Sequence, residues 1–196
     1  MHAPLAGILV CTLVVVGCAQ NARPASMAVT PVRPMAGRTP PPNSRRIAIV
    51  DVTGGGGLGW MGRPNVPNDA LRSALEQSLI GLGYLADDSA NAGVDLRVQL
   101  VRLERPWAPS KVMEVTSVVR YAAVERGTRS TIFDSTFQTT ARATSTDAAA
   151  GTTRLRIANE IAIRANIACF LAGWQSRILG RTSGDSASVA LCHESR

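Results

Sequence analysis

The chain has 196 residues, of which 45% are hydrophobic, and it carries a formal net charge of +7. That charge is unevenly divided, because residues 1–46 contain five arginines and no acid, whereas residues 47–196 contain 16 basic and 14 acidic residues. The second part is almost neutral and lacks the basic stripe with interleaved aromatic residues that nucleic-acid-binding domains carry. We expect no nucleic-acid partner.

The chain opens with an apolar run, Leu5–Gly17, that ends at a cysteine. About a dozen residues suit the apolar core of a signal peptide, whereas a helix that spans a bilayer needs about 20. The ending Val15-Val16-Gly17-Cys18 resembles a bacterial lipobox, although only His2 stands where Lys or Arg is usual. That resemblance implies that residues 1–17 are removed and that Cys18 is acylated, by palmitate or a similar chain. An ordinary secretory signal and a short membrane anchor are the alternatives.

A proline-rich segment follows the cysteine. Six of the 11 prolines lie there, among Ala, Arg, Ser and Thr and without hydrophobic periodicity: Pro24, Pro31, Pro34, Pro40, Pro41 and Pro42. Such a segment cannot bury a core, so residues 18–45 predict a flexible tether. We expect a single α/β domain over residues 46–179 and a flexible tail, rich in Ser and Gly, over residues 180–196.

The domain begins with patterns for a strand, a helix and three more strands. Residues 47–52 form an apolar run that ends in glycines, which predicts a buried strand. Asn68 is a candidate N-cap for a helix that ends before Gly83, with leucines four, four and three residues apart: Leu71, Leu75, Leu79 and Leu82. Alternation of apolar and polar residues then predicts strands around residues 94–100, 113–121 and 133–138.

The last predicted element is a long helix, from Ser145 or Asp147 to Leu179. Its apolar stripe is Ile163, Ile167, Phe170 and Trp174, beside a second row of Ile157 and Ile161, and its predicted solvent face carries Arg156, Glu160 and Arg164. The order is β-α-β-β-β-α. Because each hairpin strand has one polar face, we expect an α+β two-layer sandwich, with two helices on one face of a four-stranded mixed sheet.

Two cysteines remain once Cys11 leaves with the signal peptide and Cys18 is acylated. Cys169 and Cys192 would meet a compartment that permits disulfides, and a disulfide would attach the tail to the last helix. A buried Cys169 beside an unpaired Cys192 is the alternative. Both stay open, because geometry decides whether two cysteines pair.

The chemical motifs favour a protein that is not an enzyme. Residues 57–62 fit the pattern G-x-G-x-x-G, but Pro64 and Pro67 separate them from the next helix, so we expect a flexible glycine loop and no nucleotide. His193 is the single histidine of the mature chain, which leaves no catalytic triad, Cys-His pair or metal cluster. We expect no cofactor and no metal. A hydrolase or acyltransferase that uses carboxylates is the weakest alternative.

Two loops provide the candidate contact residues. A β-α-β crossover is parallel, so the loops at residues 53–67 and 105–110 should lie at one edge of the sheet. They carry Trp60, Met61 and Trp107, which are candidate partner contacts because exposed aromatic residues on loops often anchor a partner. The alternative is that both tryptophans fold back over the core. Because the tether should enter at the opposite edge, we expect these residues to face away from the membrane.

The chain resembles the YajG-type bacterial lipoproteins, and by element order the resemblance covers about residues 46–179. The resemblance rests on the lipobox, the proline-rich tether, the segment Leu71–Leu79 leading to Gly83-Tyr84, the strand meander, and Arg156–Glu160. It implies a small α/β domain on the periplasmic side of the outer membrane, and Ala19 after the cysteine resembles the usual outer-membrane sorting signal. We expect a non-enzymatic accessory protein with a protein partner in the cell envelope. A module of a transport system that binds a lipid or small ligand is the alternative.

Overall fold

The computed structural model describes residues 20–30, 46–59, 63–108, 110–179 and 192–195. The chain order of the elements is α1 (Pro24–Met27), β1 (Ile47–Thr53), α2 (Asn68–Gly81), the 3-10 turn η2 (Ser89–Asn91), β2 (Val94–Glu104), β3 (Val112–Glu125), β4 (Thr131–Thr144), α3 (Gly151–Leu179) and β5 (His193–Ser195). Within this part of the chain, no helix is both long and apolar enough to cross a membrane.

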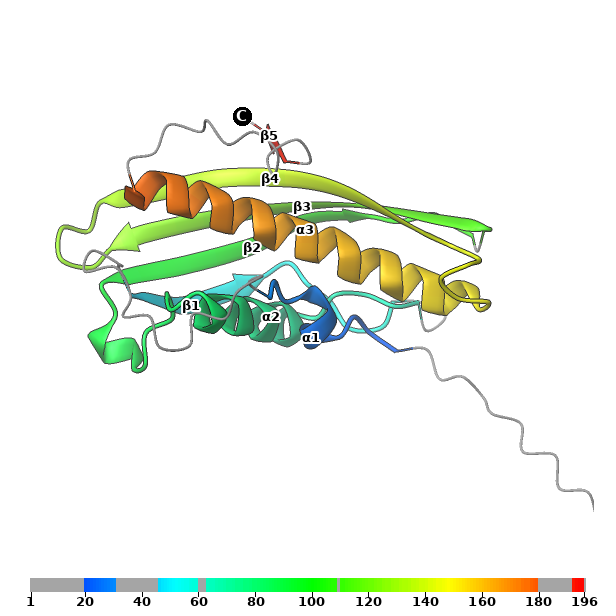
Figure 1. Ribbon diagram of the computed structural model, residues 1–196, viewed down its shortest axis with the longest axis horizontal. Coiled ribbons are helices and arrows are strands. Elements are labelled where there is room, and N and C mark those ends of the chain that lie inside the picture. The colour runs from blue at the N-terminus through cyan, green and yellow to red at the C-terminus, as the bar shows by residue number, and fades with distance from the viewer. Residues whose placement is uncertain (1–19, 31–45, 60–62, 109, 180–191, 196) are drawn as a thin grey trace, which may run out of the picture.

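The strands form one sheet in the order β1-β2-β3-β4-β5. β1 pairs with β2 in parallel, and every other neighbouring pair is antiparallel. Figure 1 shows α2 and α3 on one face of this sheet, α3 along β3 and β4 and α2 beside β1. The predicted α+β sandwich, with its four-stranded mixed sheet and two helices on one face, is confirmed. β5 adds a short fifth strand within residues that we expected to form a flexible tail, because backbone pairing with β4 fixes it.

The two faces of the sheet differ because side chains alternate along each strand. On the face away from the helices, polar side chains pair across β3 and β4: Thr116 with Thr140, Arg120 with Asp134, and Glu114 with Arg142. The other face is apolar and packs against the leucines of α2 and the apolar stripe of α3. This division leaves one face of the sheet in solvent and buries the other under the helices, so the sandwich has two layers.

An aromatic cluster fills the space between α3 and the sheet. Tyr121 stacks on Phe170 with ring centres 4.4 Å apart, and Phe133 meets Trp174 edge to face at 6.0 Å. Phe137 packs beside Tyr121 at 6.1 Å. Nearer the start of α3 the helix packs in a second cluster that contains no aromatic ring and comprises Met113, Val115, Ala141, Ala143, Leu155, Ala158 and Ala162. The two clusters together set the height of α3 above the sheet.

A buried polar network fixes α3 along the sheet. Asn166 donates from Nδ2 to the Phe137 carbonyl oxygen over 2.8 Å, and its Oδ1 accepts from the Tyr121 hydroxyl over 3.1 Å. Thr139 donates to the Ala162 carbonyl oxygen over 2.8 Å. Burial raises the pKa of the Tyr121 phenol well above its usual range, so the hydroxyl remains a donor. These groups satisfy one another, and a slip of α3 along the sheet would leave them unpaired.

A disulfide joins Cys169 of α3 to Cys192, with the two Cα atoms 5.7 Å apart. Of the two arrangements that the sequence left open, the structure has the paired one. The bond places the residue before β5 next to α3, and β5 continues from there onto the edge of β4.

The first described segment, residues 20–30, packs against the domain, although the proline content predicted a flexible tether over residues 18–45. α1 begins at Pro24, which suits the first turn of a helix because it lacks an N–H. α1 contacts both α2 and α3, and Met27 is fully buried between elements of the core. The prediction was wrong for residues 20–30 because Ala22 and Met27 bury apolar surface that periodicity analysis does not detect in so short a segment.

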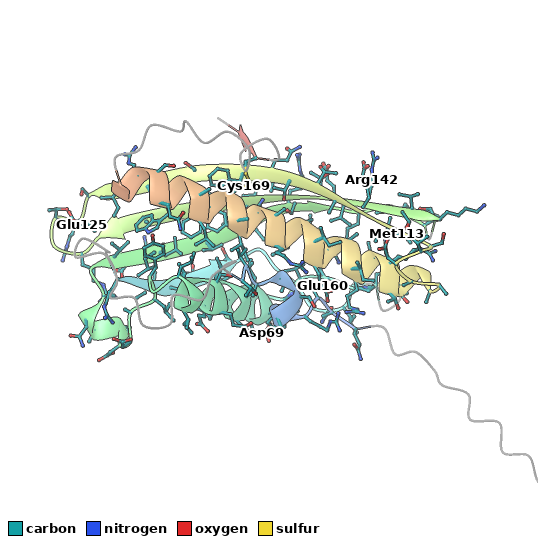
Figure 2. All side chains as sticks on the ribbon, in the orientation of Figure 1. Asp69, Met113, Glu125, Arg142, Glu160 and Cys169 are labelled. Atoms are coloured by element: carbon teal, nitrogen blue, oxygen red, sulfur yellow. A yellow bond between two sulfur atoms is a disulfide. The ribbon has the colours of Figure 1, made fainter. Side chains whose placement is uncertain are left out.

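This segment also changes which face of α3 is buried. Glu160, predicted to face solvent, is only 3% exposed, whereas Ile161, predicted to face the core, is partly exposed. Arg23 covers Glu160, because its backbone N–H and its Nε both donate to Oε1, over 3.0 and 3.1 Å. Arg156 donates to the same oxygen over 2.9 Å, as its position one turn earlier predicted. Figure 2 shows Glu160 on the side of α3 that faces α1.

Candidate functional site

The loops that follow β1 and β2 meet at one end of the sheet, as expected from their parallel pairing. Arg63 donates from Nη2 to the carbonyl oxygen of Pro106, and Arg105 donates from Nη1 to the carbonyl oxygen of Pro64 over 2.8 Å. Each loop therefore binds the other through one guanidinium group. We call this region the loop end and define it by residues 54–59, 63–67, 105–108, 110–111 and 145–150. It lies at the right of Figure 1, opposite the β3–β4 hairpin that Glu125 marks in Figure 2.

The glycines at the start of the first loop have a packing role. Gly54 has a φ of +83°, and a Cβ there would lie 2.0 Å from the Leu100 carbonyl oxygen on the neighbouring strand. At Gly55 a Cβ would lie 2.7 Å from Oδ1 of Asn68, which instead accepts the Gly55 N–H. The sequence predicted Asn68 as the N-cap of this helix, but Asn68 is the first residue of α2. The N-cap is Pro67. The glycines allow the chain to pass closely over the backbone of β2 at Leu100 and beside the start of α2.

Trp107 stands at the tip of the second loop and is 88% exposed. It does not fold back over the core, which was the alternative for the loop tryptophans. Trp60 and Met61 lie outside the described residues, between Gly59 and Arg63, which form an isolated antiparallel bridge. Of the three candidate contact residues, the structure therefore places only Trp107, and it places that side chain in solvent.

The loop end carries a net positive charge, because Asp147 is the one carboxylate among its defining residues whereas three of them are basic. The two loops, residues 54–67 and 105–111, contain three basic residues, Arg63, Arg105 and Lys111, and no carboxylate. Burial, and secondarily the neighbouring charge of Arg63, lowers the pKa of Arg105 from its usual value. Arg154 at the start of α3 adds a fourth cation, which donates to the Ser110 carbonyl oxygen over 2.9 Å. These guanidinium groups brace the loops through carbonyl oxygens.

Residues 21–22, which follow the predicted lipobox, lie at this same end. Asn65 donates its N–H to Oδ1 of Asn21 over 3.2 Å, and Ala22 donates its N–H to the Asn65 carbonyl oxygen over 2.9 Å. From there residues 22–29 run along α2 until the Val29 N–H donates to Oγ of Ser78 over 2.9 Å. The prediction that the tether enters at the edge opposite the tryptophan loops was therefore wrong for residues 20–30. It assumed that the chain leads straight into β1, whereas residues 20–30 first lie along the helices.

The predicted lipidation site, Cys18, lies outside the described residues, two positions before Gln20. Among the described residues, no group of three or more His, Cys, Asp or Glu side chains could hold a metal ion. The fully buried Asn159 donates to the Pro64 carbonyl oxygen over 3.2 Å, which ties the loop end to α3. Sequence reasoning missed this junction, since Asn21, Asn65 and Asn159 are far apart in the chain and form no motif.

Comparisons with known proteins add similarity of fold. No family model and no curated protein matches the chain. A Xanthomonas campestris protein assigned to the family model DUF330 has 19% identity and a TM-score of 0.42, over 59% of this chain and 64% of that one. This chain thus spans less than two thirds of that protein. A candidate lipoprotein from Caulobacter crescentus has 12% identity and a TM-score of 0.43, over 56% of this chain and 84% of that one. Neither similarity bears on function, and the YajG resemblance stays a prediction.

Proposed function

We propose that the protein is a lipid-anchored, non-enzymatic accessory protein of the bacterial cell envelope, held on the periplasmic side of the outer membrane through Cys18. The observation that carries this proposal is the continuity between lipobox and fold. The lipobox ends at Cys18, and the chain is already packed on the domain at Asn21 and Ala22. An acyl group on Cys18 would hold the domain itself at the membrane, without a long intervening linker.

The YajG resemblance and Ala19 support the outer membrane as the location, and the disulfide between Cys169 and Cys192 suits an oxidising compartment. The buried polar side chains support an accessory role over catalysis. Ser117, Thr139 and Asn166 bond to each other and to backbone groups, so their hydrogen bonds serve the packing of α3.

Metabolic labelling tests the anchor. Cells that express the protein with a labelled palmitate analogue should yield a labelled mature chain that begins at Cys18, as measured by gel fluorescence and by mass spectrometry of the N-terminal peptide. Cys18→Ser should abolish both the label and the cleavage before residue 18. Cys11→Ser is the matched control, because Cys11 lies in the same apolar run and should not affect either. Label that persists in Cys18→Ser, or a wild-type chain without label, would contradict the proposal.

Photo-crosslinking tests the accessory role. A crosslinking amino acid at Val101, which is exposed on β2, or at Ile80, which is exposed on α2, should capture an envelope protein from one surface and not from the other. A specific capture from one position supports a partner-binding role. Absence of capture from every exposed surface in the native envelope would contradict it.

A further inference from the structure

The exposed apolar side chains of the loop end accompany its cations. Trp107 is joined by Leu58 in the first loop and Val112 at the start of β3, and all three are large hydrophobic residues that remain exposed. Lys111, directly before Val112 in the chain, is also exposed. A tryptophan flanked by apolar and cationic side chains is the composition of a surface that sits at the boundary between lipid and water, where the ring contacts acyl chains and the cations contact headgroups.

The turn that carries Trp107 is braced. Pro106, directly before it, accepts from Arg63, and Ser110, shortly after it, accepts from Arg154 over 2.9 Å. Both donors come from other elements of the domain. The indole is therefore presented from a turn whose two sides are attached to the fold, so that little conformational freedom is lost when the ring enters another medium.

The position of the anchor decides which surface the loop end meets. Asn21 lies against Asn65 at the loop end and follows Cys18 by three residues, which span at most about 11 Å of extended chain. With its acyl chains in the bilayer, Cys18 would hold Asn21 within that distance of the headgroups. A protein partner would have to enter between the loop end and the membrane, whereas the lipid surface is already there.

We propose that the loop end rests on the phospholipid surface, with the Trp107 indole in the interfacial layer and Lys111 close to anionic headgroups. This inference rests on the proposed function, because acylated Cys18 sets the orientation. The membrane contact would hold the domain in one orientation and turn the opposite end, where the β3–β4 hairpin lies, toward the periplasm (Figure 1). A single lipidated residue would not restrict the orientation in this way.

Fluorescence quenching tests the contact in the acylated mature protein, reconstituted into phosphatidylcholine vesicles that contain phosphatidylglycerol. Trp60→Phe leaves Trp107 and the buried Trp174, which serves as an internal reference for an unquenched indole. With lipids brominated near the headgroup, the emission of Trp107 should be blue-shifted and quenched, and both effects should vanish in Trp60→Phe/Trp107→Phe. Lys111→Gln should lower the ratio of docked to undocked protein by about fivefold on anionic vesicles and leave it unchanged on neutral ones.

The matched control moves the reporter to another exposed apolar position. Ile80, near the far end of α2, is 63% exposed, and Ile80→Trp in the Trp60→Phe/Trp107→Phe background should remain unquenched. If Trp107 is quenched no more than this reporter, the inference is overturned. If Trp107 is shielded only when envelope proteins are added, the inference is also overturned, and the turn belongs to a protein partner.

A second way of attaching lipid separates this inference from the proposed function. Because Cys169 and Cys192 are paired, Cys18 is the single free thiol of the mature chain, and a phospholipid with a maleimide headgroup can be coupled to it. Quenching in the coupled protein without palmitate labelling in cells would refute the proposed function and support the lipid contact. Palmitate labelling in cells without quenching of the coupled protein would support the proposed function and refute the lipid contact.

Discussion

The burial of Met27 gives the sharpest test of the fold, because it concerns a segment that the sequence predicts to be a flexible tether. Met27 lies in α1, is fully buried, and belongs to the same core cluster as the leucines of α2. If this packing exists in solution, Met27→Ala must reduce the free energy of unfolding. If residues 20–30 are a tether, the substitution changes nothing.

The expected magnitude follows from the size of the cavity. Replacing a buried methionine with alanine costs about 2–5 kcal/mol, with the lower values where neighbours can move into the space. α1 has four residues and lies at the surface of α2 and α3, so it can shift toward them, and we expect about 2–3 kcal/mol. For a domain of this size, that loss lowers Tm by about 5–10 °C.

Thermal and urea unfolding of the mature chain, followed by circular dichroism, measure the effect. Ile80→Ala is the control, because Ile80 is mostly exposed on α2 and its truncation should change stability by about 0.5 kcal/mol or less. A Met27→Ala protein with the Tm and urea midpoint of Ile80→Ala would refute the packing of α1. It would also remove the geometric basis for placing the anchor at the loop end.

Three further predictions concern other parts of the fold. Cys192→Ser should destabilise the protein by about 3 kcal/mol, since the disulfide to Cys169 closes a sequence separation of 23 residues, and reductant should lower the urea midpoint of the wild type alone. Gly54→Ala should cost more than about 2 kcal/mol, because its Cβ would strike the backbone of β2, whereas Gly57→Ala, with open space around it, should be neutral in the same urea titration. The backbone N–H at the end of β4 lowers the pKa of Asp147, so this carboxylate stabilises the fold above its unfolded pKa near 4 and loses that effect as pH falls through its lower folded pKa. Asp147→Asn should therefore show a weaker loss of stability as pH falls below about 4, and an unchanged acid slope would count against the interaction.

The elements that the sequence predicted well are those with long, regular patterns. Leu71, Leu75 and Leu79 lie on the buried face of α2, and Ile163, Ile167 and Phe170 on that of α3, because a helical repeat places such residues on one side. The strands of the meander were recognised from alternation for the same reason. Parallel pairing of β1 with β2 followed from chain connectivity alone.

The features that sequence reasoning missed depend on contacts between distant segments. Glu160 has the spacing of a solvent-facing residue, and only the arrival of Arg23 makes its position a buried one. α1 has too few residues to show a helical periodicity. β5 has three residues, which form a strand only because they pair with the edge of β4. The pairing of Cys169 with Cys192 likewise required a distance that no sequence pattern contains.

The sequence by itself determined the fold class, an α+β domain with two tryptophan-bearing loops at one edge of the sheet, and it predicted a lipobox ahead of that domain. Periodicity and connectivity are local properties of the chain, so they can be deduced without coordinates. Only the tertiary structure decided which way the domain faces. The hydrogen bonds between Asn21, Ala22 and Asn65 join segments more than 40 residues apart, and they bring residues 21–22 to the same end as Trp107. That juxtaposition depends on the burial of a short segment between two helices, which no local pattern predicts.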